Sequence, residues 1–166
     1  MILFETPRLY ARRLCQQDEA LILRLSQDPA AKKGGLSAEF WAQDARGVAL
    51  ALIRKEDDAW IGAAHLGDMN RYEGYLEMEY GLLPAFRGMG YGREAVCGLT
   101  DFAFDARQTM VLAAWVRSGN GACARLLEAC GYTLEGRLRC HARDGQDTLC
   151  YSMLRKEWEE KANTNL

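Results

Sequence analysis

The sequence has few of the features that mark metal sites, disulfide frameworks or membrane spans. Only two residues are histidine, His65 and His141, and they lack metal-ligand spacing, so we expect no bound metal. The six cysteines include no C-x-x-C pair, which favours free or buried thiols over a disulfide scaffold. No apolar run approaches the roughly 20 residues that cross a bilayer, so we expect no membrane association through a spanning helix.

Neither sign of charge is in excess. The 21 Lys and Arg residues against 23 Asp and Glu residues give a net charge of -2. Such a balance argues against a surface built to bind nucleic acid or an anionic membrane. The opening segment lacks the basic stretch and cleavage site of a signal peptide, so we expect a cytoplasmic protein. The length suits one domain, and we expect residues 1–166 to form it.

The hydrophobic pattern alternates between strand and helix spacing and predicts an α+β protein. Helices are expected over Glu19–Ser26, from Ser37, after the glycines near residue 92, after Asn120, and from Arg155. Strands are expected at Arg8–Leu14, 48–55, 59–66, 75–83, 110–116, 133–140 and 147–154. The segment Ala30–Gly35 is expected to be a loop, and Asp144-Gly145 predicts a two-residue hairpin turn.

The stretch LLPAFRGMGYGREAV places Gly88, Gly90 and Gly92 directly before a helix that we expect to begin near Arg93. The first N–H groups of a helix have no intrahelical partner, and the helix dipole makes that end electropositive. Glycines there remove the Cβ atoms that would keep a ligand away, and the cationic side chains of Arg87 and Arg93 bracket the turn. The pattern therefore favours a pyrophosphate site on the main chain.

Other interpretations of the glycines are a Rossmann fingerprint, a P-loop, or a flexible turn without a ligand. The third glycine comes one residue too early for G-x-G-x-x-G. Gly92 is followed by Arg93 and Glu94, whereas a P-loop needs Gly-Lys-Ser/Thr. A flexible turn stays open on the glycines alone.

The stretch from Arg87 to Gly92 resembles motif A of the GNAT N-acetyltransferases, (Q/R)-x-x-G-x-(G/A). The segments ETPRLYARRL, MEYGLLPAFRGMGYGREAV and NGACARLLEACGYTLEGRLR resemble, in order, the branch that includes ribosomal-protein N-terminal acetyltransferases. This resemblance implies a mostly antiparallel mixed sheet of about seven strands between about four helices. It also implies a splay between the fourth and fifth strands. Acetyl-CoA is the implied co-substrate, a primary amine is the acceptor, and a homodimer is compatible with it.

The resemblance also assigns residues to the coenzyme. It implies that the phosphates lie on main-chain N–H groups of Arg87, Gly88, Met89, Gly90, Tyr91, Gly92 and Arg93. It implies that the pantetheine arm pairs with the strand end at Leu82 and Leu83, with a main-chain N–H near Leu82 as the oxyanion donor. Asn120 matches an asparagine that hydrogen-bonds the pantetheine, and capping of the following helix is the alternative role.

Glu77 and Glu79 are the candidate bases. Residues two apart on a strand share a face, and two acids inside a covered sheet are costly unless they are solvated or used in chemistry. Neighbouring like charges are expected to raise one pKa toward neutrality. An exposed acidic strand face is the alternative, and Glu77 matches a glutamate that is common in the branch.

The chain departs from part of the family at the general acid. Leu127 stands where many members have a tyrosine, and Cys123 stands where serine is frequent. A coenzyme thiol with a pKa of about 8.5 leaves without full protonation, so we still expect transfer to an amine. The alternatives are an acetyl-CoA sensor without turnover and a protein that holds another nucleotide phosphate on the glycine turn.

Overall fold

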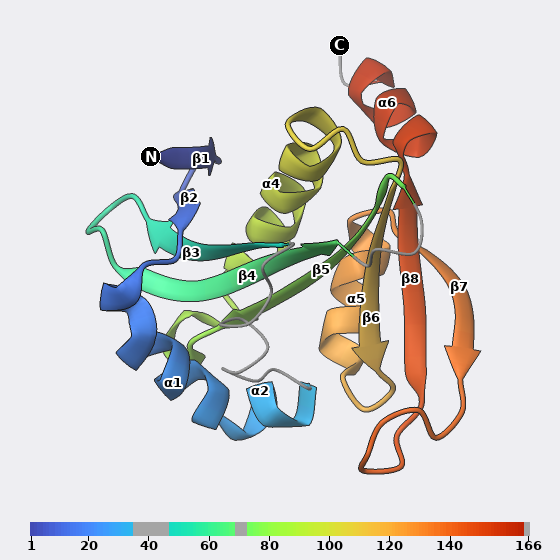
Figure 1. The fold of residues 1–166 in the computed structure, drawn as a ribbon, viewed down its shortest axis with the longest axis horizontal. Helices are drawn as coiled ribbons and strands as arrows, with labels where there is room; N and C mark the ends of the chain where they lie inside the picture. Colours follow the sequence, from blue (N-terminus) through green and yellow to red (C-terminus); the bar gives the residue numbers. More distant parts are fainter. Residues whose placement is uncertain (35–46, 69–72, 165–166) are drawn as a thin grey trace.

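The computed structural model of the protein describes residues 1–34, 47–68 and 73–164. The described chain forms one eight-stranded sheet in the order β1-β2-β3-β4-β5-β6-β8-β7 (Figure 1). Strands β5 and β6 run parallel, and the other neighbouring pairs are antiparallel. The expected mostly antiparallel α+β sheet is confirmed, with eight strands instead of about seven.

The strands are β1 (Ile2–Glu5), β2 (Leu9–Arg13), β3 (Val48–Arg54), β4 (Trp60–Asp68), β5 (Tyr75–Leu82), β6 (Val111–Arg117), β7 (Thr133–Leu138) and β8 (Thr148–Leu154). The helices are α1 (Glu19–Gln27), α2 (Pro29–Gly34), α4 (Tyr91–Asp105), α5 (Gly121–Ala129) and α6 (Arg155–Thr164). Two short 3-10 turns cover Gln16–Asp18 and Pro84–Phe86. Among the helices of the described ranges, none is both long and apolar enough to cross a membrane.

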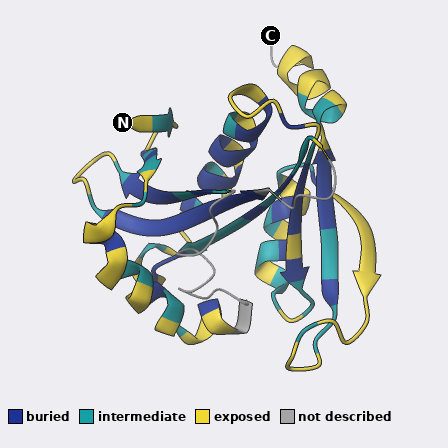
Figure 2. Ribbon diagram, in the orientation of Figure 1, coloured by how far each residue is buried: buried dark blue, intermediate teal, exposed yellow. Residues whose placement is uncertain are grey.

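Alternate residues of the central strands divide their side chains between two cores. The main core packs Leu76 and Met78 of β5 against Ala95 and Leu99 of α4, together with residues of α5. The second core lies on the opposite face, where residues of β3 and β4 pack against α1 and α2. Figure 1 shows α4 and the pair α1–α2 on opposite sides of the sheet, and Figure 2 shows the central strands buried. The strand period of two therefore decides which face each β5 residue serves.

Residues 30–34 lie in a helix, so the loop predicted at Ala30–Gly35 was wrong for these residues, and Gly35 lies outside the described ranges. Asp28 ends α1 and caps α2, because its Oδ2 accepts the N–H of Ala31 at 3.0 Å. Pro29 occupies the first helical position, where its missing N–H costs nothing. The Asp-Pro pair that predicted only the end of one helix thus also begins the next.

Two other expectations change at the sheet edges. Ile2–Glu5 forms an additional edge strand, β1, which pairs with β2 and was not predicted. The closing hairpin is not a two-residue turn, because β7 ends at Leu138 and β8 begins only at Thr148. Gly145 has a positive φ of 82° within that longer loop. The helix predicted from Ser37 lies outside the described residues.

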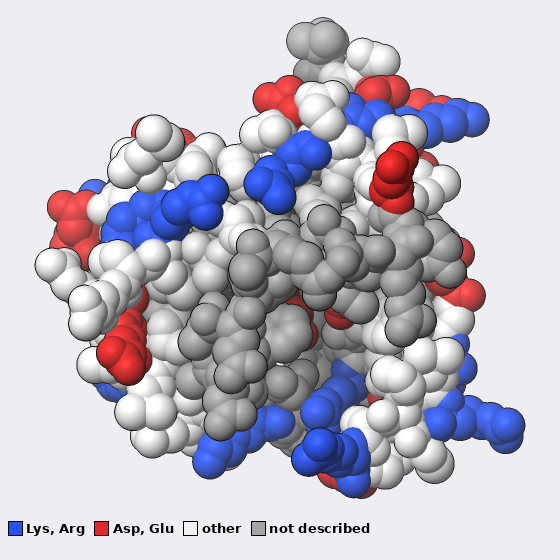
Figure 3. Space-filling view, viewed as in Figure 1, with Lys and Arg blue, Asp and Glu red and all other residues white. Residues whose placement is uncertain are grey.

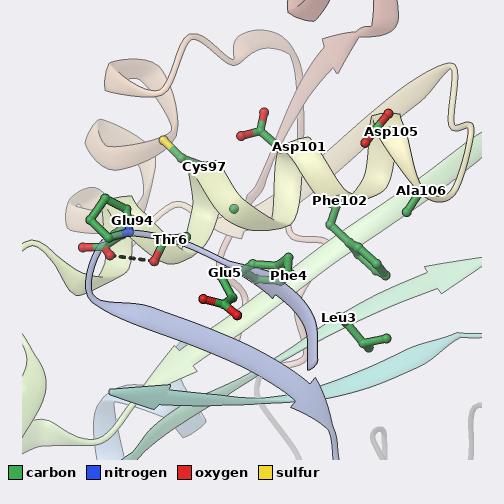
Figure 4. A pocket seen from close by; sticks show the side chains of 12 residues that line it. Leu3, Phe4, Glu5, Thr6, Glu94, Cys97, Asp101, Phe102, Asp105 and Ala106 are labelled. Atoms are coloured by element: carbon green, nitrogen blue, oxygen red, sulfur yellow. Dashed lines mark hydrogen bonds between the residues drawn. The ribbon is translucent and has the colours of Figure 1, made fainter. Parts of the chain in front are cut away.

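Strand β1 packs onto α4 at a glycine. Figure 4 shows Leu3 and Phe4 facing Phe102 of α4 around a cavity of about 360 Å³. The Phe4 and Phe102 ring centroids lie 5.8 Å apart. A Cβ on Gly98 would approach Cε2 of Phe4 to 2.5 Å, so the absence of a side chain there admits the strand.

We expect Gly98→Ala to lower the free energy of unfolding by about 1–3 kcal/mol, because overpacking displaces β1. An alanine inside a helix would otherwise stabilise it by about 1 kcal/mol. The control is Gly136→Ala in β7, where an added Cβ meets no atom of the described chain within 4 Å. Urea denaturation measures both, and a Gly98→Ala protein as stable as wild type would contradict the packing argument.

Candidate active site

Strands β5 and β6 separate part-way along their length. Their parallel pairing runs from Tyr75 opposite Val111 to Glu77 opposite Ala113, and beyond it the strands diverge (Figure 1). A cavity of about 470 Å³ occupies the divergence. It is lined by residues of β5, β6, the glycine turn and the start of α5: Met78, Glu79, Tyr80, Gly81, Leu82, Arg87, Gly88, Gly90, Gly92, Arg93, Ala114, Trp115, Val116, Asn120, Ala122, Cys123 and Leu126, with Ala30 and Ala31 of α2. The splay was expected between the fourth and fifth strands, which are β5 and β6 because β1 was not predicted. A cavity lies within this splay.

The main chain of β5 presents alternate residues to its two neighbours. Leu83 donates its N–H to the carbonyl of Ile61 on β4 at 2.8 Å. In an antiparallel ladder the next residue points the other way, so the main-chain groups of Leu82 face the divergence. By the same alternation Tyr80 also faces it. This end of β5 therefore offers a strand edge to a ligand with amide groups.

The glycine turn feeds directly into α4, which begins at Tyr91 and not near Arg93 as predicted. Gly88 and Gly90 have positive φ values of 72° and 82°, a conformation that glycine adopts without strain. The first helical hydrogen bond runs from the N–H of Glu94 to the carbonyl of Gly90 at 3.2 Å. The N–H groups of Tyr91, Gly92 and Arg93 therefore precede the intrahelical ladder.

The third glycine has a different role from the first two. Gly92 lies in the first turn of α4, and a Cβ there would come within 3.1 Å of Cδ1 of Leu126 on α5. It therefore allows the beginnings of α4 and α5 to approach each other beside the cavity. The alternate spacing in the sequence combines two turn glycines with one packing glycine.

The turn between β1 and β2 holds the glycine turn in place. Glu94 accepts hydrogen bonds from the hydroxyl of Thr6 at 2.6 Å and from Nε of Arg8 at 2.7 Å. Arg8 also donates from Nη1 to the carbonyl of Met89 at 3.0 Å, and its guanidinium lies 4.4 Å from the centre of the Tyr91 ring. These bonds lower the pKa of Glu94 against the opposing effect of burial. Thr6 and Arg8 thus position the turn, which the sequence did not reveal.

Arg87 lines the cavity and also hydrogen-bonds two segments that are distant in the sequence. Its Nε and Nη2 donate to the carbonyl of Leu82 at 3.0 and 2.7 Å, and Nη2 also bonds Oδ2 of Asp28 at 2.7 Å. The hydrogen bond from Arg87 lowers the pKa of Asp28. The guanidinium thereby joins the end of β5 to the cap of α2.

At the start of α5, Asn120 and Cys123 both line the cavity. Asn120 caps the helix, because its Oδ1 accepts the N–H of Cys123 at 3.3 Å. The cap uses only the oxygen and leaves the side-chain amide nitrogen as a donor. Leu127 is completely buried in the main core, so the position that carries tyrosine in many family members packs inside this chain.

Tyr80 of β5 contacts Cys123 beside the cavity. The hydroxyl of Tyr80 lies 3.4 Å from Sγ of Cys123, and both residues line the cavity. Burial raises the pKa of Tyr80 above its ordinary value, so the phenol keeps its proton. Burial also raises the pKa of Cys123, so the thiol stays neutral. The pair thus places two protonated groups beside the cavity.

The two glutamates lie on the opposite face of β5 from Tyr80. Glu79 lines the cavity and stands opposite His65 of β4, while Glu77 stands at the last paired position of β5 and β6. Burial raises the pKa of Glu77 to about 7. Tyr75 shares this face. The pKa of its phenol is raised mainly by burial and also by the nearby Glu77 carboxylate. Basic and acidic side chains are interspersed over the side of the molecule seen in Figure 3.

The structure therefore gathers most of the predicted site residues around one cavity. Four predicted residues do not line it: Glu77, Leu83, Met89 and Tyr91. Glu77 lies where the divergence begins, and the N–H of Leu83 is already bonded to the carbonyl of Ile61 on β4. Met89 is exposed with its carbonyl bound to Arg8, and Tyr91 is buried in the main core. Their side chains are thus separated from the cavity, and only their main chains belong to the turn.

A comparison with protein families identifies the architecture. The model described as acetyltransferase (GNAT) domain matches residues 8–133. The chain belongs to the GNAT acetyltransferase family. The expected GNAT family, the fold and the enzyme class, an N-acetyltransferase, are confirmed. Membership of the branch that includes the ribosomal-protein N-terminal acetyltransferases stays a prediction.

Relatives and solved structures agree with this assignment. The uncharacterized N-acetyltransferase YoaA of Bacillus subtilis is 26% identical over 171 residues, which cover 92% of this chain and 97% of that protein. The spermidine N-acetyltransferase of Vibrio cholerae, solved with CoA and spermine, superposes with a TM-score of 0.81 at 18% identity, covering 92% of this chain and 99% of that one. A GNAT acetyltransferase of Bacillus anthracis gives 0.80 at 18% identity, covering 95% and 100%. At this identity the solved structures show the fold alone.

The environment of Glu77 predicts a pH-dependent stability. A carboxyl whose pKa is raised to about 7 in the folded state stabilises the protein fully below its unfolded pKa, and this stability is lost as pH rises through about 7. We therefore expect the free energy of unfolding of Glu77→Gln, relative to that of wild type, to increase by about 1–3 kcal/mol as pH rises from 4 to 8. Urea unfolding across this range measures it.

The control for this prediction is Glu56→Gln, in the exposed turn between β3 and β4. Its stability should follow that of wild type at every pH. A constant difference between Glu77→Gln and wild type across the range would contradict the burial of a titrating carboxyl at Glu77.

Proposed function

We propose that the protein transfers the acetyl group of acetyl-CoA to a primary amine by direct attack in a ternary complex. The observation that carries the proposal is the cavity at the β5–β6 divergence. It has a bare-backbone turn at a helix N-terminus on one side and a carboxylate face on the other.

The described residues fit the coenzyme. Main-chain N–H groups of Tyr91, Gly92 and Arg93 would hold the pyrophosphate, since they lie at the electropositive start of a 15-residue helix. The outward-facing main chain of β5 at Tyr80 and Leu82 would pair with the pantetheine amides. The amide nitrogen of Asn120 would add a donor. Acetyl-CoA would then cross the sheet through the divergence.

The face that carries the glutamates would receive the amine. Glu77, with a pKa of about 7, is poised to accept a proton near neutral pH, directly or through a water. Glu79 lines the cavity and would attract the cationic acceptor. An outward-facing main-chain N–H of β5 near Leu82 would donate to the oxyanion that develops as the amine nitrogen bonds to the carbonyl carbon.

The opposite face would receive the leaving sulfur. Tyr80 keeps its proton and lies with Cys123 on the side of β5 away from the glutamates. As the C–S bond breaks, the phenol would donate its hydrogen bond to the thiolate. Proton acceptance and proton donation would thus be divided between the two faces of one strand, which the strand period enforces.

For the acceptor we propose an amine that loses its proton readily. An α-amino group with a pKa of about 8 needs less help than a lysine side chain at about 10.4. The sequence segments that resemble the ribosomal-protein N-terminal acetyltransferases support the same choice. Polyamines, which the Vibrio cholerae protein's name specifies, are the second acceptor class to test.

We expect Gly90→Val to weaken acetyl-CoA binding at least tenfold, because a β-branched side chain opposes the positive φ and crowds the turn (about 1.4 kcal/mol per factor of ten). The matched control is Gly145→Val, which has the same φ of 82° but lies in the closing hairpin loop. Isothermal titration with CoA measures both. Wild-type affinity in a folded Gly90→Val protein would sink the proposed phosphate site.

We expect Glu77→Gln to reduce kcat about 10²–10⁴-fold and to abolish the rise of kcat/KM with pH through about 7. Glu79→Gln should keep that rise and mainly increase KM for the amine. Release of the CoA thiol measures turnover over a panel of N-terminal peptides, polyamines and small amines. Tight CoA binding with no turnover on any acceptor would instead support a sensor.

A further inference from the structure

Two cysteines lie side by side away from the cavity. Cys97 is on α4, and Cys130 is the C-cap residue of α5, 33 positions later in the sequence. Their Sγ atoms are 4.0 Å apart. Figure 4 shows the Cys97 sulfur on the side of α4 away from Phe4. Only a small movement separates this distance from the roughly 2.05 Å of a disulfide.

The pair is open to small molecules. Cys97 is exposed and Cys130 is half-buried. Both line a second cavity of about 330 Å³, together with Met153 of β8 and Trp158 and Lys161 of α6. Asp101 lines the cavity as well, and Nζ of Lys161 donates to the carbonyl of Cys130 at 2.7 Å.

The surroundings favour a thiolate at Cys97. Its contact with Cys130, aided by the charges of Arg93 and Lys161, lowers the pKa of Cys97 to about 7 against the opposing effects of burial and Asp101. The same contact, with burial, raises the pKa of Cys130. One sulfur is thus a nucleophile near neutral pH, and its neighbour stays a thiol until it is needed.

We propose that Cys97 and Cys130 form a redox-active dithiol, which a low-molecular-weight disulfide oxidises to an intramolecular disulfide between α4 and the end of α5. This modification site is independent of the acetyl transfer proposed above.

The reaction balances in two exchange steps. The Cys97 thiolate attacks one sulfur of the small disulfide, which forms a mixed disulfide and releases one small thiolate. Cys130 then loses its proton, and its thiolate attacks the Cys97 sulfur and releases the second small thiol. Two protein thiols are oxidised, and one small disulfide is reduced to two thiols.

Helices α4 and α5 both begin at the coenzyme cavity, so the disulfide would join the elements that flank it. A disulfide between residues 33 positions apart restricts the unfolded chain. We therefore expect it to raise the melting temperature by about 5–10 °C. The other cysteines, Cys15, Cys123, Cys140 and Cys150, lie elsewhere in the fold.

The experiment treats the full-length protein with glutathione disulfide and maps the products by mass spectrometry. We expect loss of the mass of two hydrogens and a single cross-linked peptide pair that contains Cys97 and Cys130. Cys130→Ser should stop at a glutathione adduct on Cys97, and Cys97→Ser should prevent the cross-link. Cys140→Ser is the matched control, since it removes another exposed cysteine, and it should oxidise as wild type does.

Mapping wild-type protein decides the matter even if a variant is unstable. A stable glutathione adduct on Cys97 in wild type would overturn the proposal. A cross-link through Cys15 or Cys140 would do the same. So would the absence of any reaction at Cys97 and Cys130. Alkylation of reduced protein by iodoacetamide gives a second measurement. Cys97 should react at least tenfold faster than Cys140 at pH 7, and equal rates would count against the proposal.

Discussion

The candidate site depends on the end of the parallel pairing between β5 and β6. Parallel neighbours in a continuous sheet satisfy each other's main-chain hydrogen-bonding groups. Beyond Glu77 and Ala113, β5 and β6 no longer pair in this way. The unpaired edge is acceptable only where a ligand or water replaces the missing strand. The cavity and the strand edge that faces it therefore share one origin. In the proposed function, acetyl-CoA would cross the sheet at this point.

The strand period then assigns the chemistry to two faces. Glu77 and Glu79 share the side of β5 that faces α1 and α2, while Tyr80 and Leu82 face α4 and α5. A one-residue slip of β5 would exchange these faces and bury the carboxylates in the main core, at a large cost in free energy. The side chains that hold the core thus also hold the register of the proposed base and acid.

Hydrogen bonds and ion pairs between segments distant in the sequence fix the rim of the cavity. Thr6 and Arg8 bond Glu94 and the carbonyl of Met89, so the turn between β1 and β2 holds the glycine turn. Arg87 joins the end of β5 to Asp28. A turn with two positive-φ glycines has little rigidity of its own, and these bonds supply it. The Cys97–Cys130 contact lies further along α4 and α5 and adds a covalent means of joining the same helices.

The sequence by itself determined the α+β class, the glycine turn before a helix and the shared face of Glu77 and Glu79, and it gave the helix cap as one of two roles for Asn120. Each of these depends on spacing within a few residues, where local geometry is nearly fixed. Tertiary structure alone decided the rest. The Tyr80–Cys123 and Arg8–Glu94 contacts join residues 43 and 86 positions apart, and the raised pKa of Glu77 comes from burial by several elements. Neither long-range contact nor burial has a local pattern, because both arise only when the layers pack together.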